Sequence, residues 1–144
     1  MTTIVYRNGV MAADSRAYAG DKHPTGTKSK LRRLSDGSLL GVSASIPGLP
    51  DSFRRAVEKY GTDEDFQEAF DLKALLVKPD GTVWYFNTGC CFTGPLLGDF
   101  FSTGSGEAYA YGAMMMGADA VKAIEVAIEC DAWTDGPVTR LTLY

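Results

Sequence analysis

Hydrophobic and polar residues alternate along several short segments, and glycine-containing turns separate these segments. TTIVYR (2–7) and VMAAD (10–14) flank Asn8-Gly9, KLRRLS (30–35) and SLLGVSA (38–44) flank Asp36-Gly37, and KALLVK (73–78) and TVWYFN (82–87) flank Pro79-Asp80-Gly81. Asn-Gly and Asp-Gly between two such segments are strong signals for a β-hairpin. The pattern therefore predicts three hairpins, with further strands over DFFSTG (99–104) and VTRLTLY (138–144).

Four other segments have the spacing of amphipathic helices. SFRRAVEKY (52–60) places Phe53 and Val57 on one face, with Asp51 as a predicted N-cap and Gly61 as the end. A short helix is predicted over EDFQEAF (64–70) and a third over GEAYAYGAMMM (106–116). Asp119 is the predicted cap of a fourth helix, AVKAIEVAIEC (120–130).

The order of these elements indicates the fold class. Strands in runs followed by helices in runs are typical of α+β proteins. Two antiparallel sheets packed face to face, with helices on both outer sides, would use every predicted element. We therefore expect a four-layer αββα sandwich, formed by a single domain over residues 1–144.

Composition narrows the classes of function. The net charge of −4 disfavours a nucleic-acid or anionic-membrane partner, and no apolar run approaches the roughly 20 residues of a membrane helix. No basic and then apolar leader is present, so we expect a cytoplasmic protein. The three cysteines fit neither a disulfide framework nor a zinc ligand set. We expect no metal and no cofactor.

The first predicted hairpin places the N-terminal residues beside an acidic side chain. With Asn8-Gly9 as a two-residue turn, Ile4 lies opposite Ala13, and continuing the register sets Thr3 opposite Asp14. Removal of Met1 would give Thr2 a hydroxyl and a free α-amine, whose reference pKa is about 7.7–8.0. That amine can serve as the general base for the hydroxyl of its own residue, so no histidine is needed.

Several motifs resemble one family along nearly the whole chain. TTIV, RNG, AAD, KLRRL, GSGEAYAYG and CDAWTDGPV occur in the order found in β-type proteasome subunits and, most closely, in bacterial HslV peptidases. These are threonine proteases with an N-terminal nucleophile. The resemblance implies a threonine-type endopeptidase, assembled into a homo-oligomeric ring that acts on polypeptide substrates, with a possible ATP-dependent unfoldase as partner.

The resemblance also implies a role for individual residues. Thr2 matches the nucleophile, Asp14 the neighbouring acid and Lys30 the essential lysine. Ser105 matches the serine of the GSG motif, and Asp131 and Thr134 match residues that hold the amino terminus. The oxyanion donor would be the backbone N–H near Ser45, where the family usually has glycine. Ser43 is the predicted lining of the substrate pocket.

Some features leave other functions open. The segment around DSFRRAVEKYG and EDFQEAF is shorter than the two long helices of the family, so the first helical layer is reduced. A non-catalytic shell or regulatory protein of the same fold, or an amidase acting on a small molecule, are the alternatives.

The candidate residues also have purely structural interpretations. Asp14 could end a strand, Asp131 could stand in a turn, and Ser105 could cap the following helix. Lys28, Lys30, Arg32 and Arg33 could be the solvated side chains of an edge strand.

Overall fold

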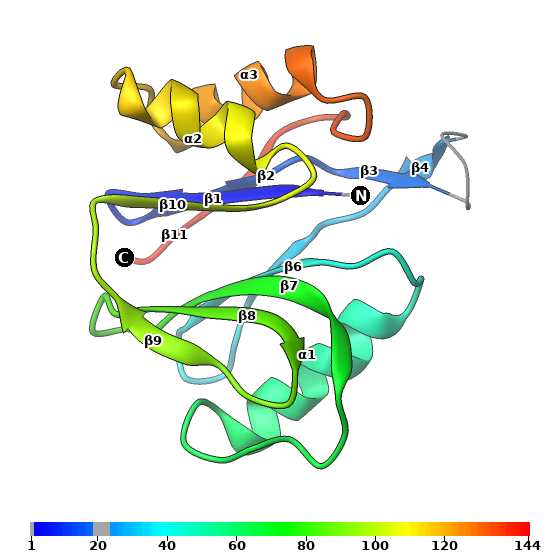
Figure 1. Cartoon of the computed structure of the whole chain (residues 1–144), viewed down its shortest axis with the longest axis vertical. Coiled ribbons are helices and arrows are strands. Elements are labelled where there is room, and N and C mark those ends of the chain that lie inside the picture. The colour runs from blue at the N-terminus through cyan, green and yellow to red at the C-terminus, as the bar shows by residue number, and fades with distance from the viewer. Residues whose placement is uncertain (1, 19–23) are drawn as a thin grey trace.

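The fold is a four-layer sandwich of two antiparallel sheets between helices, as expected from the sequence. The computed structural model describes residues 2–18 and 24–144. Helices α2 (Glu107–Met115) and α3 (Ala120–Cys130) cover the outer side of the first sheet, and α1 (Leu49–Tyr60) covers the outer side of the second (Figure 1). The reduced outer layer thus consists of α1 in the described residues.

The first sheet has β1 at its centre. Its strand order is β10 (Phe100–Gly104), β1 (Thr3–Arg7), β2 (Val10–Ala13) and β11 (Thr139–Thr142). β1 and β2 form the predicted hairpin with Arg7 opposite Val10 and Ile4 opposite Ala13. Asn8 and Gly9 both have positive φ, which a two-residue hairpin turn of this type requires.

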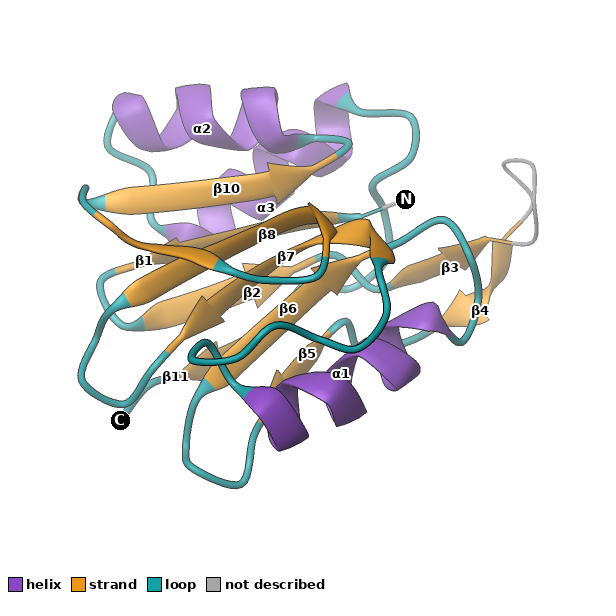
Figure 2. Cartoon of the chain, turned by 60° about the horizontal axis from the view of Figure 1, so that its bottom comes forward, coloured by secondary structure: helices purple, strands orange, loops and turns teal. Residues whose placement is uncertain are grey.

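The second sheet contains the other two predicted hairpins. Its order is β5 (Leu31–Arg33), β6 (Leu39–Ser43), β7 (Phe70–Val77), β8 (Val83–Gly89) and β9 (Thr93–Leu96). Helix α1 runs along the outer face of this sheet, and a two-stranded sheet of β3 (Arg16–Tyr18) and β4 (Pro24–Thr27) extends beside its N-terminal end (Figure 2).

Alternation along β1 divides the interior into layers. Ile4 and Tyr6 point into the core between the two sheets, and Val5 points into the core under α2 and α3. The two sheets approach closely at Gly41, where a Cβ atom would lie 2.6 Å from the Ile4 side chain. A larger residue at this position in β6 would push the sheets apart.

The helix predicted over residues 64–70 is absent from the structure. Phe66 lies in a loop and Phe70 begins β7, yet both rings pack on Phe53, at centroid distances of 5.6 and 5.3 Å. The two phenylalanines are four residues apart, which is also the spacing of side chains on one face of a helix. Here both are buried because they contact Phe53 on α1, and no helix is needed to bring them together.

Two smaller differences concern the N-cap of α1 and three short strands. Helix α1 begins at Leu49 after Gly48, so Asp51 lies in its first turn and is not the cap. Asp119 does cap α3, because its side chain accepts the N–H of Lys122 at 2.8 Å. Strands β3, β4 and β9 lack a clear alternating pattern and were not predicted.

Among the described residues, no helix is both long enough and apolar enough to span a bilayer.

Candidate active site

A buried ion pair connects β5 to the first hairpin. The Lys30 ammonium donates to Asp14 Oδ2 at 3.0 Å, and the two side chains are 10% and 0% exposed. Asp14 Oδ1 accepts the N–H of Thr3 at 3.0 Å, and Oδ2 accepts the N–H of Asp135 at 3.2 Å. The predicted register therefore does bring Asp14 to the beginning of the chain, where the carboxylate also holds Lys30.

Burial and pairing act in opposite directions on this pair. Burial raises the pKa of the Asp14 carboxyl, against the charge of Lys30 and the donated hydrogen bonds. Burial lowers the pKa of the Lys30 ammonium, against the negative charge of Asp14. Each group thus depends on the other to remain charged in this environment.

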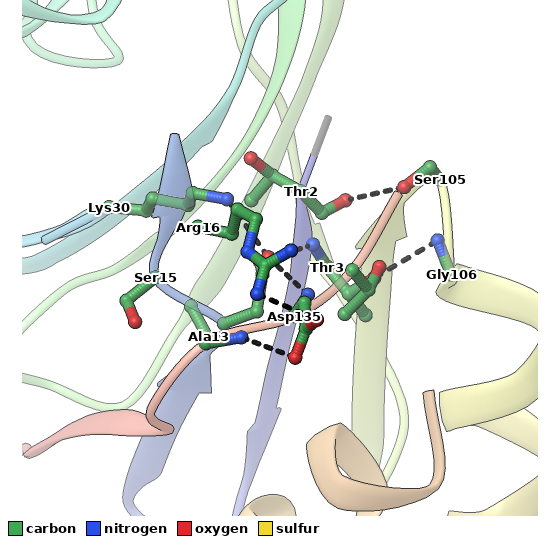
Figure 3. Close-up of polar contacts among 12 residues, drawn as sticks. Thr2, Thr3, Ala13, Ser15, Arg16, Lys30, Ser105, Gly106 and Asp135 are labelled. Carbon is green, nitrogen blue, oxygen red and sulfur yellow. Dashed lines mark hydrogen bonds and ion pairs between the residues drawn. The ribbon is translucent and has the colours of Figure 1, made fainter. Parts of the chain in front are cut away.

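Thr2 lines a cavity together with Lys30. The cavity has a volume of about 210 Å³, and Thr2, Lys30 and Ser45 are among its lining residues. Figure 3 shows the Lys30 side chain extending toward Thr2 from the segment that precedes β5. A threonine, a lysine and a loop residue thus line one cavity, and Thr2 itself is only 3% exposed.

Thr3 points to the other side of the strand, into a closed network. Its Oγ1 accepts the N–H of Gly106 at 3.0 Å and lies 2.7 Å from Thr134 Oγ1. Thr134 donates to Asp131 Oδ2, which also accepts the Ser105 hydroxyl at 2.7 Å. Because a carboxylate only accepts, Thr134 must donate to Asp131, and Thr3 must then donate to Thr134.

The backbone of Thr2 is fixed by the loop after β10. Its carbonyl oxygen accepts the N–H of Ser105 at 2.8 Å, and the Ser105 hydroxyl lies at 3.5 Å from the same oxygen (Figure 3). Gly104 has φ +107°, and a Cβ atom there would lie 1.8 Å from that carbonyl. A Cβ at Gly106 would lie 2.4 Å from Thr3 Oγ1. The glycines of the GSG segment are therefore needed for the close approach of β1.

Comparison with solved structures finds the same fold in other proteins, among them HslV and BPH. Eukaryotic HslV from Trypanosoma brucei superimposes with a TM-score of 0.69 at 16% identity, covering 99% of both chains. BPH of Thiobacillus denitrificans gives a TM-score of 0.66 at 18% identity, covering 99% of this chain and 98% of that chain. This chain has the HslV fold.

One of these neighbours was also solved with a bound small molecule. BPH of Thiobacillus denitrificans in complex with epoxomicin gives a TM-score of 0.65 at 18% identity, and this chain is covered to 99%. No family model and no curated protein matches the sequence. At this identity the likeness to HslV and BPH concerns the fold, and the resemblance expected from the motifs is shown at that level.

Within the HslV fold, the structure brings most of the predicted site residues together. Thr2, Lys30 and Ser45 line the cavity, Asp14 lies behind Lys30, and Ser105 contacts Thr2 through its backbone. Within the described residues, the hydrogen bonds that connect Asp131 and Thr134 to Thr2 run through Ser105 and Thr3. The Thr134 hydroxyl contacts the side chain of Thr3, one residue beyond the amine to which the sequence analysis assigned it.

The pocket prediction for Ser43 is wrong for this cavity. Leu40, Val42 and Ala44 line it, and Ser43 does not. Side chains alternate along β6, so the residue between Val42 and Ala44 faces the opposite side of the sheet. The sequence shows that side chains alternate along this strand, but it does not show which face of the strand lies beside Thr2.

The structural interpretation of Ser105 is also excluded. Helix α2 has Gly106 as its N-cap with no capping side chain, and the Ser105 hydroxyl bonds Asp131 instead. Met1 and His23 lie outside the described residues. Within those residues, no group of three or more His, Cys, Asp and Glu side chains is placed to hold a metal ion.

Sequence reasoning missed several residues around the cavity. Arg16 lines it and pairs with Asp135 at 2.9 Å, and Trp133 and Arg54 line it as well. Trp133 stands inside the CDAWTDGPV motif, so its position could have been suspected. Arg54 belongs to α1, and nothing in the helical pattern indicates that it faces Thr2's cavity.

Proposed function

We propose that this chain is a threonine-type peptidase in which Thr2, exposed by removal of Met1, is the nucleophile. The observation that carries the proposal is the shared cavity of Thr2 and Lys30, with Asp14 buried behind the lysine. The HslV fold agrees with this assignment. Thr2, Lys30 and Ser45, which were named from the sequence, line one cavity.

In the proposed reaction, the free α-amine of Thr2 takes the proton of its own hydroxyl. The Oγ1 atom attacks the peptide carbonyl carbon, and the C=O π electrons move to the oxygen. Lys30, held by Asp14, places a positive charge near the amine and the hydroxyl, which lowers the pKa of the amine and favours the alkoxide. The hydroxyl thus becomes a nucleophile without an imidazole.

The tetrahedral intermediate carries a negative oxygen that needs donors. The Ser45 backbone N–H lies in the loop that lines the cavity, and we assign the oxyanion contact to it. Collapse of the intermediate breaks the C–N bond, and the amine of Thr2 returns its proton to the leaving nitrogen. Water, deprotonated by the same amine, then hydrolyses the ester on Thr2.

The second network has a positioning role in this mechanism. Ser105 fixes the Thr2 carbonyl, and Thr3 is held by Gly106 and Thr134. Because β1 is restrained on both sides of the nucleophile, the hydroxyl is held in place before substrate arrives. Such preorganisation reduces the entropy that the reaction must lose.

The fold also supports a proposal about assembly. We infer a homo-oligomeric ring that takes polypeptide substrates delivered by an ATP-dependent unfoldase. Large apolar side chains stand exposed on α2 and at its C-cap, including Tyr109 at 47%, Met115 at 65% and Met116 at 89%. Light scattering of the purified protein tests the ring, since a monomeric mass would contradict it.

The decisive experiment on the activity is the intact mass of the protein with and without an epoxyketone electrophile. We expect loss of the Met1 mass and one covalent adduct in the wild type, and no adduct in Thr2→Ala. Thr3→Ala is the matched control, because it removes the neighbouring hydroxyl and should still react. Retention of Met1 together with the absence of an adduct would contradict the proposed function.

A further inference from the structure

A row of basic side chains leads away from Thr2 along the edge of the second sheet. Lys28, Lys30 and Arg32 are spaced two positions apart along the chain, and all three line the cavity. Leu31, between two of them, points into the core between the sheets. The alternation of an extended chain therefore places three cations on one face and the apolar residue on the other.

Helix α1 adds a further cation to the same cavity. Arg54 lies in its second turn and lines the cavity, and Asp51, one turn earlier, is the acidic residue in the lining. The protein as a whole has a net charge of −4. The concentration of positive charge in this cavity is therefore opposite to the charge of the molecule.

Acidic partners neutralise part of this charge. Arg16 pairs with Asp135 at 2.9 Å, Lys28 with Asp51 at 3.0 Å, and Lys30 with Asp14 at 3.0 Å. Among the described residues, the ion pairs include neither Arg32 nor Arg54. The two arginines leave the cavity with an excess of positive charge.

The Nε atom of Arg54 lacks a hydrogen-bond acceptor in the described structure. This atom is also buried. A buried donor without an acceptor costs free energy, so such groups are normally paired. An acceptor supplied by a ligand in the cavity would satisfy it, and a carboxylate matches the planar donor set of a guanidinium.

We propose that the cavity between Thr2 and Arg54 binds an acidic side chain of the polypeptide substrate, with Arg54 and Arg32 as the residues that select it. The inference rests on the proposed function and names the preference of the same site. Ile46, Pro47 and Trp133 provide apolar walls in the cavity. These walls suit the methylene groups and backbone of a glutamate or aspartate in a peptide better than a free inorganic anion.

The test uses matched peptides of ten residues that differ at one position. Glutamate and glutamine are placed in turn at each position on both sides of the cleaved bond, and kcat/KM is measured for each pair. In the wild type, glutamate should be preferred about tenfold at one position, since a charge-assisted contact replaces a neutral one. In Arg54→Gln this ratio should fall to about 1.

Arg55→Gln is the matched control. Arg55 is the next residue of α1, is exposed, and does not line the cavity. It should keep the wild-type ratio, because the change in net charge is the same but the cavity is intact. Arg32→Gln, on the exposed edge strand, should lower the ratio in part and serves if Arg54→Gln does not fold. An unchanged ratio in both arginine variants, or no preference in the wild type, would overturn the inference.

A binding experiment separates this inference from the proposed function. The same peptides are labelled with a fluorophore, and their affinity for Thr2→Ala is measured by fluorescence anisotropy. This measurement does not require the peptide to be cleaved. Tighter binding of the glutamate peptide without any cleavage by the wild type would support the acidic subsite and contradict the peptidase. Cleavage with no difference between glutamate and glutamine peptides would leave the peptidase and remove the subsite.

Discussion

Thr2 and Thr3 are adjacent, identical side chains in different environments. Both are buried, at 3% and 0% exposed, but Thr2 lines a cavity with Lys30, while Thr3 is bonded to Gly106 and Thr134. The difference follows from the alternation of an extended strand, which sends consecutive side chains to opposite sides. One hydroxyl faces the space that a substrate can enter, and the other holds the strand that presents it.

In the proposed mechanism Thr2 therefore serves the reaction, and the next residue, Thr3, serves the stability of the fold. The hydrogen-bonding capacity of Thr3 is used inside the protein, as a donor to Thr134 and an acceptor from Gly106. A hydroxyl committed in this way is a poor candidate for attack on a substrate. Variants at the two positions should therefore fail in different assays.

The largest effect is expected at Thr2. Thr2→Ala should reduce peptide hydrolysis by a factor on the order of 10⁶, as for the loss of a nucleophile in other covalent peptidases. Its free energy of unfolding should fall by about 1 kcal/mol, the typical loss for a point substitution, because Thr2 is 3% exposed but lines a cavity. Urea unfolding measures the stability of the variant, and initial rates measured on the same preparation give its activity. A variant with wild-type turnover would show that Thr2 is not the nucleophile.

The next largest effect is expected from breaking the ion pair behind Thr2. Asp14→Asn should lower the free energy of unfolding by about 3–5 kcal/mol, because it leaves the Lys30 ammonium buried without its counter-charge. Urea unfolding measures the loss.

A double variant separates the structural and chemical roles of this pair. Asp14→Asn with Lys30→Met removes both charges, so it should be more stable than Asp14→Asn alone. It should nevertheless remain inactive, because the positive charge beside Thr2 is gone. Recovery of activity in the double variant would contradict the role given to Lys30.

A smaller effect is expected at Thr3. Thr3→Val keeps the shape but leaves the Gly106 N–H and the Thr134 hydroxyl without a buried partner, which should cost about 1–3 kcal/mol of unfolding free energy. The adduct with an epoxyketone should still form on Thr2, as mass spectrometry would show. A stable variant that loses the adduct would reverse the assignment of the two threonines.

The smallest effect concerns pH. Burial lowers the pKa of Lys30 below 10.5 in the folded state, so the unfolded chain binds more protons between the two values. The cost of this charge is fully present below the folded pKa and is relieved as pH rises through it. The unfolding free energy of the wild type, relative to the Asp14→Asn/Lys30→Met variant, should therefore rise with pH in this alkaline window. A fall would mean that pairing with Asp14 outweighs burial.

Much of the fold could be predicted because the local signals were short-range. The Asn8-Gly9 turn fixed the register of β1 and β2, and Asp119 identified the start of α3. The helix expected at residues 64–70 failed because its phenylalanines obey a tertiary constraint, contact with Phe53, that resembles helical spacing. Strands such as β9 depend on their neighbours and carry no pattern of their own.

The candidate site was predictable where the hairpin or a motif determined it. Asp14 followed from the register, and Lys30 and Ser105 from the resemblance to HslV. Arg54 could not be found in this way, because its place in the cavity depends on how α1 packs across the second sheet. Ser43 failed for the same reason, since the sequence does not say which face of β6 the cavity adjoins.

The central position of β1 has a consequence for synthesis of the protein. Thr3 lies opposite Gly104 and contacts Thr134, so part of the network that holds β1 comes from segments translated much later than its hairpin partner β2. At about 5–20 residues per second, the hundred residues between Thr3 and Gly104 give roughly 5–20 s. During that interval β1 can pair with β2 but lacks β10 on its other side. The edge of β1 beside Thr3 is therefore covered late in synthesis.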